Sequence, residues 1–293
     1  MDGQPRPVPD PTRLETDVRA LSVVRHPAAA PDALAAAEDY VALELGAAGL
    51  RVERQLFEWD GAEFHNVVAT RDGEAAGRPM VVVGAHFDTR AHTPGADDNA
   101  SGVAAMLEVA RILRGARLAA TVQMVGFNLE EMQRLPHYAL GSRAYVRRLR
   151  EHGQPVAGAL VLEMLGFTQP RQGAPPGARL FTDVPRVGNF LSAVGDRGSR
   201  ELLEAFRRAA EPHVPVSPLT VPLRGWLLPD TRRSDNCRFW DEGFAALMIT
   251  DTADFRNPHY HRPSDTPDTL DYAFLTRATA AVAAAVVELA GAA

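Results

Sequence analysis

Met80-Val81-Val82-Val83-Gly84-Ala85 is an uninterrupted apolar run, rich in β-branched residues, and it decides the fold class. Such a run is typical of a strand that is buried on both faces of a sheet. Similar runs follow along the chain at 121–127, 159–164 and 244–250. Segments with helical periodicity lie between them. Because strands that alternate with helices pack in layers, the pattern predicts a three-layer α/β/α sandwich.

The rest of the chain predicts the helices, a hairpin and the loops around this sheet. Thr12-Arg13-Leu14-Glu15 matches a capping box at the start of a first helix. Residues 1–11, with four prolines, are therefore expected to form a disordered arm before a single domain over 12–293. Asp60-Gly61 favours a hairpin turn between strands 50–59 and 64–70. Further helices are expected at 32–49, from 101, at 142–151, at 200–211 and after Asp271, and a long loop at 168–185.

Composition limits the class of protein. The 293 residues carry 31 basic and 37 acidic side chains, and the net charge of -6 argues against nucleic acid or an anionic membrane as a partner. One cysteine, Cys237, excludes a disulfide framework and a cysteine-rich zinc site. The longest apolar run, at 278–289, is too weakly hydrophobic to span a bilayer. No secretory signal is visible, so we expect a cytoplasmic protein, or a secreted one whose signal was removed.

Acidic and imidazole side chains follow the predicted buried strands. His86-Phe87-Asp88 follows the first strand, Glu130-Glu131 the second, Glu163 ends the third, and Tyr260-His261 follows the fourth after a loop. Strand ends of this kind form the ligand-binding edge of α/β sheets. Several carboxylates at one edge repel one another unless a divalent cation neutralises them. Imidazole with carboxylate, without thiolate, suits zinc in a catalytic site, and cobalt or manganese less exclusively.

These segments resemble the co-catalytic dizinc aminopeptidases of metallopeptidase family twenty-eight, which also holds glutaminyl cyclases and some carboxypeptidases. The resemblance rests as well on Gly95-Ala96-Asp97-Asp98-Asn99-Ala100-Ser101-Gly102 and on Glu163-Met164-Leu165-Gly166. It extends from about residue 14 to 290. It implies an α/β/α fold with a mixed, mostly parallel sheet, and a metal-dependent aminopeptidase that acts on peptides with a free N-terminus.

The resemblance implies a set of metal ligands. His86 and Glu163 would hold one zinc ion, Glu131 and His261 would hold the other, and Asp98 would bridge the two. Glu163 departs from the pattern, because many aminopeptidases have Asp at this ligand position. Its extra methylene group is expected to shift one ion and the anchoring of the substrate amine.

The resemblance also implies three supporting roles. Asp88 would hydrogen-bond the far nitrogen of His86 and fix its tautomer. Glu130 would be the general base, which takes a proton from the attacking water and passes it to the leaving amine. Tyr260 would donate a hydrogen bond to the oxyanion. A cis peptide bond is often found in the family directly after the bridging residue, here before Asn99.

Two further departures concern the surroundings of the site. Ser234-Asp235-Asn236 stands where many relatives have Ser-Asp-His, and we expect this change to affect the pocket rather than the metals. The loop at 132–140 is longer than the short turn common in the family, and its Arg134 and His137 are expected at the entrance.

Other functions were weighed against the aminopeptidase. A glutaminyl cyclase shares the fold, but commonly has Trp directly before the last zinc histidine, where this chain has Tyr260. A non-catalytic zinc-binding domain would be expected to lack ligands or the base, and all are present here. Ser101 is interpreted as a helix-start residue rather than a nucleophile, and Cys237 as a small buried residue.

Overall fold

The structure, a computed structural model, describes residues 8–132, 139–180 and 182–291. Within these residues eight strands form one sheet: β1 (Arg51–Trp59), β2 (Ala62–Arg71), β3 (Met80–His86), β4 (Val122–Phe127), β5 (Val156–Glu163), β6 (Leu191–Asp196), β7 (Val216–Val221) and β8 (Ala246–Thr250). The α-helices are α1 (Pro11–Leu21), α2 (Pro31–Ala47), α3 (Gly102–Leu113), α4 (Leu140–Glu151), α5 (Arg200–Ala210), α6 (Asn236–Asp241) and α7 (Tyr272–Ala290).

The sheet is mixed, with a parallel centre. Its strand order is β1-β2-β4-β3-β5-β8-β6-β7. The four central strands β4, β3, β5 and β8 run parallel, while β2 and β6 pair with them in the antiparallel direction. Every residue of β3 is buried, as expected for a strand covered on both faces. Because the four central strands are parallel, their carboxyl ends meet at one edge of the sheet.

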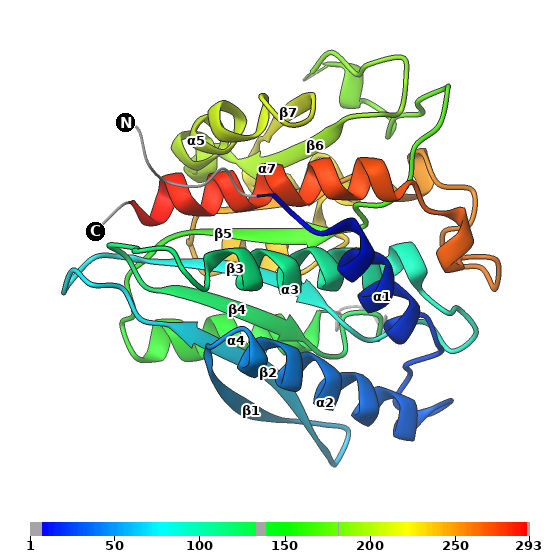
Figure 1. The fold of residues 1–293 in the computed structure, drawn as a ribbon. Helices are drawn as coiled ribbons and strands as arrows, with labels where there is room; N and C mark the ends of the chain where they lie inside the picture. Colours follow the sequence, from blue (N-terminus) through cyan, green and yellow to red (C-terminus); the bar gives the residue numbers. More distant parts are fainter. Residues whose placement is uncertain (1–7, 133–138, 181, 292–293) are drawn as a thin grey trace.

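Helices cover both faces, so the prediction of a three-layer α/β/α sandwich is confirmed (Figure 1). One apolar core joins the sheet to α1, α2, α3, α5 and α7, and a smaller one joins the other face to α4 and α6. Contrary to the prediction for the apolar run at 278–289, the helix that contains it, α7, is long and apolar enough to cross a membrane by length and composition. Most of it is buried here against α3 and α5, which is the packing of a core helix.

The first helix begins differently from the prediction. Asp10, not Thr12, is its N-cap, and the Asp10 carboxylate accepts hydrogen bonds from the backbone N–H groups of Thr12 and Arg13. Pro11 occupies the first helical position, where its missing N–H costs nothing. The predicted capping box was therefore wrong: Glu15 forms an ion pair with Arg19 instead. Asp10 and Pro11 belong to the helix start, and residues 1–7 of the predicted arm lie outside the described residues.

The largest omission of the sequence prediction is the β6–β7 end of the sheet, together with α6. β7 contains Pro218, which lacks the N–H that a central strand needs, and so the segment was not predicted as a strand. The sheet tolerates this proline because β7 is the edge strand. The predicted loop at 168–185 contains one short 3-10 turn, Ala178–Leu180, among its described residues.

Candidate metal centre and active site

The candidate site lies at the carboxyl edge of the parallel strands. His86 is the last residue of β3, Glu163 is the last residue of β5, and Glu130 and Glu131 follow β4. His261 comes from the loop after β8. The strands thus deliver these side chains to one edge, as the sequence predicted.

Asp98 reaches the same place from the acidic turn before α3. Gly95 starts this turn with φ +68°, and a Cβ there would overlap the Asp98 carbonyl group, so the turn requires glycine. The Asp265 carboxylate accepts hydrogen bonds from the backbone N–H groups of Asp97 and Asp98, at 2.9 and 3.1 Å. The peptide bond between Asp98 and Asn99 is cis, as the resemblance implied.

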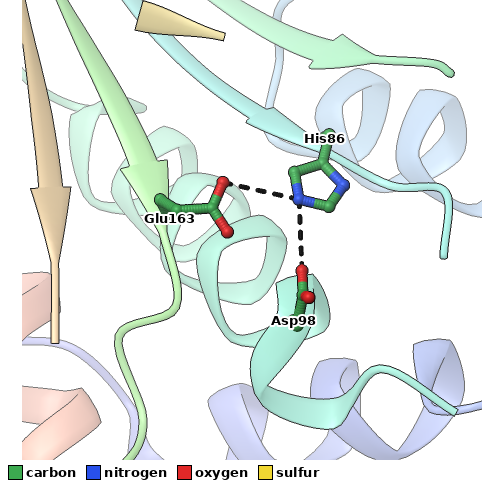
Figure 2. Close-up of side chains that lie close together, drawn as sticks. All are labelled: His86, Asp98 and Glu163. Atoms are coloured by element: carbon green, nitrogen blue, oxygen red, sulfur yellow. Dashed lines mark ion pairs between the residues drawn. The ribbon is translucent and has the colours of Figure 1, made fainter. Parts of the chain in front are cut away.

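Two clusters of potential metal ligands share Asp98. In the first, the Nε2 atom of His86 lies 3.3 Å from Oδ1 of Asp98 and 3.5 Å from Oε2 of Glu163 (Figure 2). In the second, Nε2 of His261 lies 3.1 Å from Oδ2 of Asp98 and 2.8 Å from Oε1 of Glu131. Within each cluster one ligand atom per residue lies within 4.8 Å of the others. The two oxygens of Asp98 therefore face different clusters.

The donor set of these clusters fits zinc. Each cluster offers one imidazole nitrogen and two carboxylates, which is a catalytic rather than a cysteine-rich structural set. Two buried ligand atoms, Nε2 of His261 and Oε2 of Glu131, make ion-pair contacts with described residues but no well-aligned hydrogen bond. Since buried polar atoms are normally paired, these atoms fit a role in binding a cation.

Burial and mutual repulsion shift the protonation of the site. Burial, together with the negative Asp98, raises the pKa of Glu131 to about 7. Burial alone would lower the pKa of His261, but its close contacts with the Asp98 and Glu131 carboxylates outweigh burial and raise that pKa to about 9. The pKa of His86 is likewise raised well above its ordinary value. Burial lowers this pKa, but Glu163 and the other carboxylates near His86 outweigh the effect of burial. Without a cation, protons thus neutralise part of the charge.

Asp88 supports the site in two ways. Its carboxylate oxygens accept hydrogen bonds from the backbone N–H groups of Glu130 and Glu131, both at 2.9 Å. The far nitrogen of His86, Nδ1, lies 3.2 Å from the Asp88 carbonyl oxygen and 3.5 Å from its carboxylate. The closer partner of this nitrogen is therefore the Asp88 backbone, while the Asp88 carboxylate fixes the Glu130-Glu131 segment. The second of these roles was not predicted.

Glu130 and Tyr260 border the clusters without belonging to them. Burial raises the pKa of Glu130 well above its ordinary value, and the negative Glu131 and Glu163 add to this effect. No hydrogen bond reaches the Glu130 carboxylate from any described residue, so it is available to a ligand. The Tyr260 hydroxyl accepts a hydrogen bond from Nη2 of Arg233 at 3.0 Å. Its own proton thus remains available for donation.

Sequence reasoning missed several neighbours of the site. Nε of Arg90 lies 2.7 Å from Oε2 of Glu131, and the Ser234 hydroxyl donates to Oε2 of Glu163 at 2.5 Å. The Asn236 side chain donates a hydrogen bond to the backbone carbonyl of Thr231, a residue that lines a pocket, at 3.0 Å. Arg134 and His137, expected at the entrance, lie outside the described residues.

Comparison with known proteins assigns the family. The profile of peptidase family M28 matches residues 66–286. The uncharacterised protein YfbL of Escherichia coli is 32% identical over 274 residues, covering 89% of this chain and 83% of YfbL. A probable leucine aminopeptidase of Arthroderma otae is 27% identical, covering 78% of this chain and 56% of the fungal protein. The chain thus spans about half the length of that relative.

Solved structures share the fold at low identity. An aminopeptidase from Aneurinibacillus sp. superposes with a TM-score of 0.73 at 16% identity, covering 98% of this chain and 95% of that one. A glutaminyl cyclase from Porphyromonas gingivalis gives 0.71 at 21% identity, covering 96% and 99%. Aminopeptidases and cyclases are thus equally good matches to the fold. The family profile and the aminopeptidase-named relative support a hydrolase of peptide bonds, and the chain belongs to peptidase family M28.

Proposed function

We propose that the chain is a two-zinc aminopeptidase, which removes the N-terminal residue of peptides that have a free α-amine. The observation that carries this proposal is the placement of Asp98, whose two oxygens face two separate histidine–carboxylate pairs. His86 and Glu163 would hold one ion, Glu131 and His261 would hold the second, and Asp98 would contribute to both. Bound zinc would polarise the scissile carbonyl group and lower the pKa of the attacking water.

The remaining residues supply proton transfer and charge stabilisation. Glu130, which no described residue hydrogen-bonds, accepts a proton from the attacking water and delivers it to the leaving amine. The Asp88 carboxylate keeps Glu130 in place by accepting a hydrogen bond from the Glu130 backbone N–H group. Tyr260, oriented by Arg233, donates its hydroxyl proton in a hydrogen bond to the developing oxyanion.

The free α-amine distinguishes an exopeptidase from an endopeptidase. Glu130 and Glu163 offer carboxylate oxygens at the buried end of the site, where a cationic amine neutralises negative charge. An acetylated amine leaves that charge unmatched and adds bulk. Unmatched buried charge costs several kcal/mol, and about 1.4 kcal/mol corresponds to a factor of ten. N-acetylation of a good substrate is therefore expected to lower kcat/KM by at least roughly 10²-fold.

The test is a panel of aminoacyl anilides, free and N-acetylated, assayed with zinc-loaded protein. Equal cleavage of the free and acetylated forms would show that the site is open beyond the amine, and the proposal would fail. A Gln-initiated peptide distinguishes the cyclase, because hydrolysis releases free glutamine whereas cyclisation leaves a pyroglutamyl peptide and ammonia. Mass spectrometry separates these products.

A further inference from the structure

A pocket begins at the candidate site and extends away from the metal ligands. Glu163, Ser234 and Tyr260 line it where it meets the site. From there it crosses β8, β6 and β7, the end of the sheet that the sequence did not predict. It encloses about 780 Å³ of empty space, part of which is open to solvent. A substrate residue whose amine lies near Glu163 can direct its side chain into this pocket.

Two cross-strand rows of side chains form the floor of the pocket. The strand register pairs Thr250 with Ser192, and Ser192 with Ser217; two residues along, it pairs Met248 with Val194, and Val194 with Leu219. Paired residues point to the same face of a sheet, and all six line the pocket. We call these rows the hydroxyl row (Thr250, Ser192 and Ser217) and the apolar row (Met248, Val194 and Leu219).

The hydroxyl row continues directly from a candidate metal ligand. Thr250 is the register partner of Glu163 on β5. Neighbouring strands lie about 4.8 Å apart, so Ser192, two strands from Glu163, is roughly 10 Å from it along the row. A short side chain such as that of Ala does not span this distance from the site. A long one, such as that of Met or Gln, reaches Ser192.

The Ser192 hydroxyl is available to form hydrogen bonds with a ligand. Its side chain is 9% exposed, and among the described residues nothing hydrogen-bonds its hydroxyl. By contrast, the Thr250 hydroxyl accepts from the Thr252 backbone N–H at 2.9 Å, and the Ser217 hydroxyl donates to the Asp183 carbonyl at 3.4 Å. Because Ser192 lines the pocket and no described residue pairs with its hydroxyl, the hydroxyl can donate to or accept from a ligand. Ser192 is therefore suited to hydrogen-bond the end of a bound side chain.

Charge at the pocket excludes acidic side chains. Among the described lining residues, the charged ones are Glu163, Asp230, Arg233 and Asp254, with a net charge of -2. Arg233 forms ion pairs with Asp230 at 3.3 Å and Asp254 at 3.2 Å, and all three are partly exposed, which places them towards solvent. The floor carries no charge to pair with a buried carboxylate or ammonium group.

We propose that this pocket binds the side chain of the N-terminal residue and selects a long, uncharged side chain with a polar end, such as that of glutamine. The apolar row contacts the aliphatic stem, and Ser192 hydrogen-bonds the terminal amide. The inference rests on the proposed aminopeptidase function and adds its substrate class.

The test compares two substrates of similar length, Gln-anilide and Met-anilide. Wild-type protein is expected to cleave Gln-anilide at least as efficiently as Met-anilide, and both better than Ala-anilide. Ser192→Ala should lower the ratio of kcat/KM for Gln over Met by about tenfold, which is the scale of one hydrogen bond. The matched control is Val194→Ala, which shortens the stem contact and should lower both values while leaving the ratio unchanged. Inhibition by free Gln and free Met should follow the same pattern, independently of turnover.

The outcomes separate the two proposals. If zinc-loaded wild-type protein cleaves no aminoacyl anilide, the aminopeptidase function itself is wrong. If it cleaves them but Ser192→Ala changes the ratio by less than twofold, or wild type prefers Met by more than tenfold, only the pocket inference is overturned. Unchanged melting temperature and zinc content of both variants exclude a general structural effect.

Discussion

The two halves of the candidate metal centre are built differently. His86 and Glu163 end β3 and β5, two strands that pair directly in the centre of the sheet. His261 and Glu131 both come from loops after strands. The His86 side chain is 1% exposed, whereas that of His261 is 21% exposed. One half is fixed by the sheet, and in the other half the histidine is closer to solvent, although the Glu131 side chain is only 3% exposed.

The contacts that support the ligand residues also differ between the two halves. In the first half, Oε2 of Glu163 accepts a hydrogen bond from the buried Ser234 and lies 3.5 Å from Nε2 of the buried His86. In the second, Glu131 contacts the partly exposed Arg90, and the His261 ring stacks on Tyr260 at 3.7 Å between centroids. We infer that an ion held by His86 and Glu163 exchanges more slowly than one held by Glu131 and His261.

The largest effect is expected for Asp98→Asn, because Asp98 belongs to both halves. The substitution keeps the size of the side chain but removes its charge. Zinc content should fall in both halves, and kcat/KM should fall by at least about 10⁴-fold, the upper scale for a single acid–base group. Elemental analysis and anilide kinetics measure the two effects. Asp268→Asn, at a position that is 80% exposed and forms a surface ion pair with Arg19, is the control.

Adjacent glutamates are expected to behave in opposite ways. Glu130→Gln should retain zinc and the fold but lose roughly 10²–10⁴-fold in kcat, because only proton transfer is impaired. Glu131→Gln should lose zinc from the more exposed half and leave the His86 half occupied. If Glu130→Gln empties the site and Glu131→Gln does not, the assignment of the pair is reversed.

Asp88→Asn probes the support that the halves share. The Asp88 carboxylate accepts hydrogen bonds from two backbone N–H groups. In Asp88→Asn, the amide NH₂ group would face one of these N–H groups, and that hydrogen bond would be lost. Loss of such supporting contacts typically lowers metal affinity or activity by about 10–100-fold. Zinc titration with a competing chelator measures it. An effect confined to one ion would show that Asp88 does not couple the halves.

The smallest expected effect is a pH dependence. With a pKa of about 9, His261 holds a proton at pH 7 in the metal-free protein, and the raised pKa of His86 acts in the same sense. Because this pKa is raised on folding, protonated His261 stabilises the folded, metal-free protein. The contribution to the free energy of unfolding is fully present below the ordinary histidine pKa and is lost as the pH rises through about 9. Zinc must displace these protons. Apparent zinc affinity should therefore rise up to about pH 9, and calorimetry in buffers of different ionisation enthalpy should detect proton release at pH 7. Zinc binding without proton release would contradict the predicted protonation.

How much the sequence predicts depends on whether the signal is local. The strand at 80–85 and the residues that follow each buried strand were predicted because hydrophobic runs and strand ends are local features. Asp265 was not predicted, since its contacts with the turn at 97–98 span more than 160 residues of sequence. β7 was not predicted because it contains Pro218, which argues against a central strand. The strand can contain this proline because it lies at the edge of the sheet.

The pocket could not be predicted for a related reason. Ser192 and Ser217 are unremarkable in sequence, and only the register of β6 and β7 aligns them with Thr250 and Glu163. The two rows of the floor are properties of the sheet, not of any segment. A motif therefore located the metal ligands, while the substrate pocket required the three-dimensional structure.

In a two-zinc centre, Asp98 is the residue that both metal ions share. The most direct measurement is a crystal structure of the zinc-loaded protein with anomalous diffraction recorded at the zinc absorption edge. We predict two anomalous peaks, one between His86 and Glu163 and one between Glu131 and His261, with the Asp98 carboxylate between them. A single peak at full activity, or two peaks that do not share Asp98, would contradict the two-zinc centre.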